Sequence, residues 1–443
     1  MFHSLNIFLK TLFFEKKALK WFFFFLLQAV LYLYFITSVH RSEMYHVLFL
    51  FIFLFASYFL FLTKLDVSLL KIAVAFAIIF RVVMLCGLPW LSDDFYRFLW
   101  DGYLSYHGIN PYLYTPQELV DSGFMSPFSI TLMNSPSFYT VYPPFGQFTF
   151  FIANYIAEGN VLYATLVMKI QMLCAELGTL YFLSALLKTK GRQTHILIYA
   201  LNPLIIIEFV GNLHAEGFAI FFLVFAFWLI EKKKLVLSSI AFALAVCSKL
   251  LPLLLLPSML WLLGFRKAVC YTIAVCFFTI ISFLPFWDTH LFLYMSKSLK
   301  LYFNDFEFNA SFYYLFKWMH WEVFEGALYV LKGLFLVVFF LIWYLRRGTT
   351  LFTFLESVLF IFIAYLFSTQ SIHPWYIGIP LFLSVFSTYR FPLVWTFLSI
   401  FTYVTYQTEA MQQQMWVVFI EYVLLFAVMA WELSKKRSLF LSF

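Results

Sequence analysis

The chain has 443 residues, of which 64% are hydrophobic and only 12% charged, and its formal net charge is +7. A soluble domain carries about 25% charged residues and cannot cover this much apolar surface, so the composition excludes a soluble fold. The basic residues form short clusters between apolar runs, which is typical of loops that face anionic lipid and argues against a nucleic-acid partner.

We therefore expect an all-α polytopic membrane protein, organised as one membrane domain over residues 1–443. A spanning helix needs about 20 apolar residues, and the apolar segments predict about 12 to 14 of them, some short enough to be half-helices. The candidate spans are 19–38, 45–63, 66–90, 161–187, 195–211, 214–230, 234–248, 250–264, 268–287, 323–345, 351–369, 374–389, 391–407 and 415–433.

The basic clusters predict the orientation. If both termini are cytoplasmic, alternation of the spans places every cluster on the cytoplasmic side, as the positive-inside rule requires. Segment 143–157 must then be an interfacial or re-entrant helix, because counting it as a full span would invert every later loop. The clusters lie at 188–192, 232–234, 266–267, 346–347 and 435–437.

Two long segments fall outside in this topology, 91–142 and 288–322, and the first begins with the charged stretch LSDDFYRFLWDG. This stretch fits a helix start, in which Ser92 caps the helix and Arg97 pairs with Asp93 or Asp94. Its aromatic residues also predict an amphipathic helix lying along the membrane surface. Its carboxylates would then meet a lipid-borne substrate and a water-borne one.

Such a carboxylate suits one chemistry. A sugar linked to a lipid phosphate already has a good leaving group, so the enzyme needs a base for the attacking hydroxyl. It also needs cationic or hydrogen-bonding groups for the departing phosphate. Attack from the opposite face inverts the anomeric centre, as in an inverting glycosidase.

The stretch SDDFYRFLWDGYLSYHGINPYLYTP resembles the first external loop of the GT-C superfamily, the polyprenyl-phosphate-sugar-dependent membrane glycosyltransferases. Bacterial mannosyltransferase-like members share a D-x-YR-x-x-WDG…G-x-NPY pattern, followed by motifs similar to VYPP (141–144), LNPLIIIEFVGNLHAEG (201–217) and SIHPWY (371–376). The resemblance implies a GT-C-type helical bundle with interfacial helices in segment 91–142.

The resemblance also implies roles. Asp94 occupies the D-x-YR position and would be the catalytic base, with Asp93 as the second candidate. The reaction would move a sugar, with mannose favoured over glucose or arabinose, from a polyprenyl-phosphate carrier to a glycan or glycolipid acceptor on the extracytoplasmic face. Glu216 stands where the family motif has aspartate.

Other polar residues at external positions have two interpretations each. His214 follows the span 195–211 and is either a substrate contact or a structural hydrogen-bonding group. His373 precedes Pro374, which favours an extended backbone at a helix start; it either contacts the phosphate or anchors the interface. Lys249, at an external turn, either contacts the phosphate or snorkels to the interface.

Residues Asn212 and Glu216 alternate with His214, so the three cannot share one helix face and suit a loop or a broken helix end. Asn110 and Tyr112, in the NPY turn, either shape the loop or contact substrate. The predicted donor-phosphate and substrate-binding set is Arg97, His214, His373, Lys249, Asn212, Glu216, Asn110 and Tyr112.

No metal-ligand spacing and no nucleotide-binding motif occur in the sequence. We expect no required cofactor, although Asp93, Asp94 and a phosphate are compatible with a divalent cation. The rival functions are a transporter or lipid flippase, which would need a midplane site, and a non-catalytic partner in cell-envelope assembly. The expected location is the cell membrane, with membrane lipid as a further partner.

Overall fold

The computed structural model describes residues 16–300, 306–319, 327–407 and 412–435. These residues are helical apart from loops, with one isolated parallel β-bridge between Phe308 and Ser371 and no strand, so the all-α class is confirmed. Residues 301–305 and 320–322 of the predicted loop 288–322 lie outside the described residues, as do the start of the predicted span 323–345 and residues 436–437 of the last basic cluster.

The α-helices define the architecture. They are α2 (Lys16–Ser38), α3 (Met44–Lys64), α4 (Leu70–Val83), α5 (Asp94–Tyr106), α6 (Pro116–Asp121), α7 (Pro144–Ala157), α8 (Val161–Lys188), α9 (Ile196–Ala200), α10 (Pro203–Ile205), α11 (Glu216–Glu231), α12 (Leu235–Ser248), α13 (Met259–Leu263), α14 (Phe265–Ser282), α15 (Leu291–Lys300), α16 (Phe312–Trp318), α17 (Ala327–Leu345), α18 (Leu351–Phe367), α19 (Gly378–Ser384), α20 (Phe391–Leu398) and α21 (Met415–Lys435).

Shorter helical turns complete the fold. The 3-10 segments are Val67–Leu69, Met84–Cys86, Ile130–Leu132, Gln193–His195, Leu251–Ser258, Leu284–Phe286, Pro374–Ile377 and Ser399–Gln407, and Ile206–Gly211 is a π-helical turn.

Six helices in the described part of the chain are long and apolar enough to cross a membrane, and a bent pair makes up to seven. A multi-pass protein is therefore confirmed. The number is lower than the 12 to 14 spans expected, because several apolar segments are short or broken; four apolar helices have only 10–17 residues. The six are Ala18–Ser38, Met44–Lys64, Val67–Cys86, Val161–Lys188, Phe265–Phe286 and Met415–Lys435.

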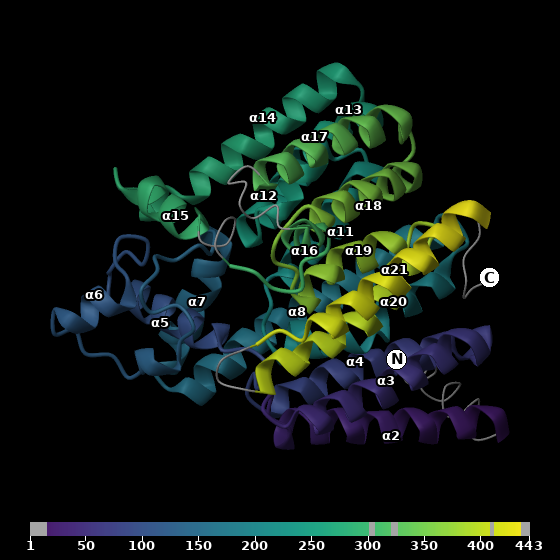
Figure 1. Ribbon diagram of the computed structural model, residues 1–443, viewed down its shortest axis with the longest axis horizontal. Helices are drawn as coiled ribbons and strands as arrows, with labels where there is room; N and C mark the ends of the chain where they lie inside the picture. The colour runs from purple at the N-terminus through teal and green to yellow at the C-terminus, as the bar shows by residue number, and fades with distance from the viewer. Residues whose placement is uncertain (1–15, 301–305, 320–326, 408–411, 436–443) are drawn as a thin grey trace.

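The long helices lie side by side and are tilted relative to one another, with α2, α3 and α4 along one edge and α14 and α17 along the opposite edge (Figure 1). The helices of segment 91–157, namely α5, α6 and α7, gather at one end of the bundle, and α15 lies at that end too (Figure 1). Helices form in the first long loop, as α5, and at 143–157, as α7; their interfacial or re-entrant position stays a prediction.

Helices α5 and α7 pack closely because Gly102 has no side chain. A Cβ at this position would lie 2.3 Å from the Phe150 carbonyl oxygen and 2.3 Å from the Asn154 amide. The Asn154 Nδ2 donates to the carbonyl oxygen of Leu99 at 3.1 Å, which joins the two helices. The glycine of the WDG motif therefore sets the distance at which α5 lies on α7.

The predicted span 195–211 is broken into two helical halves, and the second half leads into the candidate site. The Asn202 side chain accepts hydrogen bonds from the backbone N–H groups of Leu204 and Ile205, and Pro203 starts the next helix. The two halves, Gln193–Ala200 and Pro203–Gly211, are bent by 54°. The second half ends in the π-helical turn, a feature that often occurs at functional sites.

Candidate active site

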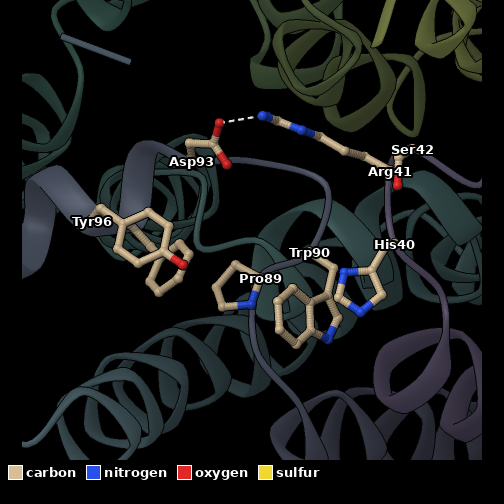
Figure 2. Close-up of a pocket in the computed structure, with 8 residues that line it drawn as sticks. His40, Arg41, Ser42, Pro89, Trp90, Asp93 and Tyr96 are labelled. Atoms are coloured by element: carbon tan, nitrogen blue, oxygen red, sulfur yellow. Dashed lines mark ion pairs between the residues drawn. The ribbon is translucent and has the colours of Figure 1, made fainter. Parts of the chain in front are cut away.

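A cavity of about 230 Å³ lies between the α2–α3 loop and the start of α5. Figure 2 shows the Arg41 side chain extended toward Asp93 above it, with Tyr96 on one side and Trp90 and His40 on the other. It is lined by His40, Arg41, Ser42, Pro89, Trp90, Asp93, Phe95 and Tyr96.

The two neighbouring carboxylates of this region have different partners. Asp93 forms an ion pair with Arg41; partial burial raises the pKa of Asp93, and Arg41 opposes that effect. The Oδ1 of Asp94 accepts a 2.6 Å hydrogen bond from the amide of Asn134. Asp93 therefore faces a cation, whereas Asp94 is bound by a neutral group.

Arg97 binds Asp101 and the loop around residues 135–138 rather than Asp93 or Asp94. Its Nε donates to Asp101 Oδ1 at 2.7 Å, and its Nη1 donates to the carbonyl oxygens of Ser135 and Phe138. The expected pairing of Arg97 with Asp93 or Asp94 is wrong, because Asp101 lies one helical turn further along the buried face of α5. Its contact with a phosphate stays a prediction.

The π-helical turn Ile206–Gly211 contains a buried carboxylate, that of Glu208. Glu208 accepts a hydrogen bond from the hydroxyl of Tyr403, and its Oε2 lies 3.1 Å from Nε2 of His214. Asn212 Oδ1 accepts from the backbone N–H of Leu91 at 3.2 Å, which ties the turn to the start of the charged stretch. The loop or broken helix end predicted for Asn212, His214 and Glu216 is confirmed, with Glu216 as the first residue of α11.

Two of the predicted histidines stack on one indole. The ring of Trp375 lies 3.7 Å from that of His214 and 4.4 Å from that of His373, at interplanar angles of 9° and 8°. Phe308 covers His373 at a centroid distance of 4.5 Å. The structure therefore unites residues from the GNLHAEG and SIHPWY motifs in one aromatic column.

The imidazole of His373 is neutral in this setting. Burial, together with the nearby His214 and Lys249, lowers the pKa of His373 to about 3. Its Nδ1 is buried without a hydrogen-bond partner among the described residues. If His373 contacts a phosphate, as predicted, it does so as a hydrogen-bonding group rather than as a cation.

A third charged pair joins the predicted residues Lys249 and Glu216. The Lys249 Nζ lies 2.8 Å from Glu216 Oε1 and 5.0 Å from the ring centroid of Tyr376. Lys249 is 28% exposed, whereas the Glu216 side chain is buried. The longer side chain of glutamate at the motif's acid position therefore reaches a lysine on the next connecting segment.

Tyr406 lies near both the carboxylate pair and the histidine column. Its ring lies 5.5 Å from the Arg41 guanidinium and 5.9 Å from Phe308, which covers His373. Asp93, Asp94 and Glu208 all interact with it electrostatically. Tyr406 thus lies next to Arg41, the partner of Asp93, and next to Phe308, which stacks on His373.

The NPY turn is placed apart from these groups. Asn110 Nδ2 donates to the Phe286 carbonyl oxygen at 2.8 Å, and the Tyr112 hydroxyl donates to the Tyr142 carbonyl oxygen at 2.6 Å. Tyr112 also packs on Phe283 in a small second core. These contacts favour the loop-shaping interpretation; substrate contact by Asn110 or Tyr112 stays a prediction.

Sequence reasoning missed Arg41, Trp375 as the stacking partner, and Tyr406. Arg41 carries a usable signal, because it is an arginine in a short loop that the predicted topology places outside, where basic residues are depleted. Trp375 and Tyr406 have no such signal in so aromatic a chain. Among the described residues, no three His, Cys, Asp or Glu side chains form a metal-binding group.

A protein-family model described as Alpha-(1->6)-mannopyranosyltransferase, N-terminal domain, matches residues 26–265, more than half of the chain. The match includes Arg41, Asp93, Asp94 and the segment from Glu208 to Lys249, whereas the SIHPWY motif lies beyond it. No curated protein matches the chain.

Proposed function

Because the chain belongs to the alpha-(1->6)-mannopyranosyltransferase family, we propose that it moves mannose from a polyprenyl-phosphate carrier to a glycan or glycolipid acceptor on the extracytoplasmic side of the membrane. Family membership makes it a membrane mannosyltransferase, with a sugar donor and a sugar acceptor. The rival interpretations, a transporter or flippase and a non-catalytic partner, have no comparable support.

The reaction forms one bond and breaks one. The O6 of the acceptor attacks C1 of mannose while its proton passes to a carboxylate. The bond from C1 to the phosphate oxygen breaks, and the polyprenyl phosphate leaves with the electron pair. Attack opposite the phosphate inverts C1, so an α-linked product requires a β-linked donor.

We assign the base to Asp94. The observation that carries the assignment is the division of partners between the two carboxylates. Arg41 holds the charge of Asp93 in an ion pair, whereas Asp94 is oriented by a neutral amide. A general base must lie within hydrogen-bond reach of the hydroxyl whose proton it removes, and the amide of Asn134 orients the Asp94 carboxylate without placing a cation on it.

Two cations are suited to the leaving phosphate. Arg41 lies between Asp93 and Tyr406, and its planar fork matches the phosphate oxygens. Lys249 lies beside Glu216 and is partly exposed. Each would exchange its carboxylate or aromatic contact for the phosphate as the donor enters.

We infer that these side chains, rather than a metal ion, neutralise the phosphate. A chelator such as EDTA is then expected to leave transfer unchanged, and restoration of lost activity by Mg²⁺ or Mn²⁺ would refute this part of the proposal. The proposed extracytoplasmic position of the active site is inferred from the basic clusters, which the positive-inside rule assigns to the cytoplasm.

The decisive experiment compares two donors. Purified protein receives either radiolabelled polyprenyl-phosphomannose or radiolabelled GDP-mannose, together with a manno-oligosaccharide acceptor. Label from the polyprenyl donor alone supports the proposal. Label entering product from GDP-mannose, with no carrier-loading enzyme present, contradicts it.

A further inference from the structure

We propose that the cavity beside Asp93 is the subsite that holds the terminal pyranose of the acceptor. This inference rests on the proposed function and adds to it the place and manner in which the acceptor binds. The cavity is built from two loops, around His40 and Trp90, and from the first turn of α5 (Figure 2).

The size of the cavity fits one sugar ring. Its volume of about 230 Å³ is below the range of roughly 300–1,000 Å³ that is usual for sites of drug-sized ligands. A polyprenyl chain, which needs a long apolar groove, does not fit it. The cavity therefore suits a compact substrate group better than the lipid tail of the donor.

The walls combine the groups that a pyranose requires. Its C–H face is apolar and packs on aromatic rings, while its hydroxyls point outward to polar groups. Trp90 is half-buried, with His40 at a centroid distance of 4.1 Å, and Tyr96 is half-buried over Phe95 at 4.1 Å. The Asp93 carboxylate lies at the same cavity as a hydrogen-bond acceptor for hydroxyls.

The cavity lies next to the proposed base. Asp93 lines the cavity and Asp94 is the next residue, so their Cα atoms are about 3.8 Å apart. A general base must lie within hydrogen-bond reach of the proton that it removes. A sugar in this cavity would place a hydroxyl beside Asp93, one residue from the proposed base, and the cavity also borders Arg41, so the acceptor ring and the donor phosphate would meet at the Asp93–Arg41 pair.

Access supports the acceptor rather than the donor. His40 and Ser42 line the cavity and are exposed, so the cavity opens to the surface beside the start of α5. A glycan that extends into water can enter there with its terminal ring first.

The test separates acceptor binding from donor binding. Transfer from polyprenyl-phosphomannose is measured at increasing concentrations of a lipid-free manno-oligosaccharide, and donor KM is measured separately. For Trp90→Ala we expect the acceptor KM to rise about fivefold to tenfold, as for loss of an aromatic contact, with donor KM unchanged. Trp90→Phe should recover most of the affinity, and the exposed Trp287→Ala is the matched control that should behave as wild type.

A binding measurement independent of activity completes the test. Saturation-transfer NMR with methyl α-mannoside, without donor, should show contact in the wild type and a loss of signal in Trp90→Ala. An unchanged acceptor KM and signal in Trp90→Ala, or a rise in donor KM instead, overturns the inference. If the wild type transfers no mannose, the proposed function fails, while the NMR comparison still decides whether the cavity binds the sugar.

Discussion

The side-chain amide of Asn134 donates a 2.6 Å hydrogen bond to Oδ1 of Asp94. Asn134 belongs to the long loop that Arg97 anchors through the carbonyl oxygens of Ser135 and Phe138. The loop therefore orients the proposed base, and the buried Arg97–Asp101 pair holds the loop. Asp94, Arg97 and Asp101 of α5 therefore all interact, directly or through one another, with the same loop.

The first prediction concerns the base. Asp94→Asn keeps the size of the side chain but removes the proton acceptor, so kcat should fall by about 10²- to 10⁴-fold. Asp93→Asn, the matched control, should lower transfer less, because Asp93 is already paired with Arg41. Initial rates with radiolabelled polyprenyl-phosphomannose measure both. Near-normal turnover in Asp94→Asn together with loss in Asp93→Asn would move the assignment by one residue.

The second prediction separates two arginines. Arg41→Gln should lower kcat/KM for the donor by about 10- to 150-fold, the equivalent of about 1.5–3 kcal/mol for a hydrogen bond to a charged group, with little change in thermal stability. Arg97→Gln should instead lower the unfolding temperature, because it leaves Asp101 buried without its cation. Steady-state kinetics and unfolding in detergent distinguish them. A donor effect confined to Arg97→Gln would reverse the two roles.

The third prediction follows from the neutral His373. Since the pKa of His373 is lowered to about 3 by burial, its imidazole stays uncharged from about pH 5 to pH 8 and contributes no inflection there. The pH profiles of kcat/KM for wild type and His373→Gln should have the same shape. An inflection near the ordinary histidine pKa that disappears in His373→Gln would show that His373 titrates after all.

The fourth prediction tests the α5–α7 contact. Gly102→Ala places a methyl group 2.3 Å from the Phe150 carbonyl oxygen, so it should destabilise the protein by about 1–3 kcal/mol through overpacking. Gly333→Ala, in α17, is the control, because a Cβ there meets nothing within 4 Å. Thermal unfolding of the detergent-solubilised variants measures the difference. Equal stability of the two variants would contradict the close approach of the helices.

Much of the fold could be predicted because hydropathy and helix signals act over short stretches of chain. The first three spans and the presence of a helix in the charged stretch follow from apolar length and the amphipathic pattern, whereas Asp93 rather than the expected Ser92 is the N-cap and the break at Pro203 was not predicted. The D-x-YR resemblance likewise indicated the carboxylates and the mannosyltransferase class from local sequence alone.

The partners of these residues depend on how the helices pack. Nothing near Asp93 in the sequence indicates that its ion-pair partner is Arg41, from the α2–α3 loop. Nor does the sequence indicate that Arg97 pairs with Asp101 rather than with Asp94. Trp375 joins His214 to His373 across two motifs. Local patterns determine which segments become helices and which chemical groups are present. The contacts among those groups arise when distant helices bury their faces together, because a partner is chosen by distance and burial in space, which local sequence does not encode.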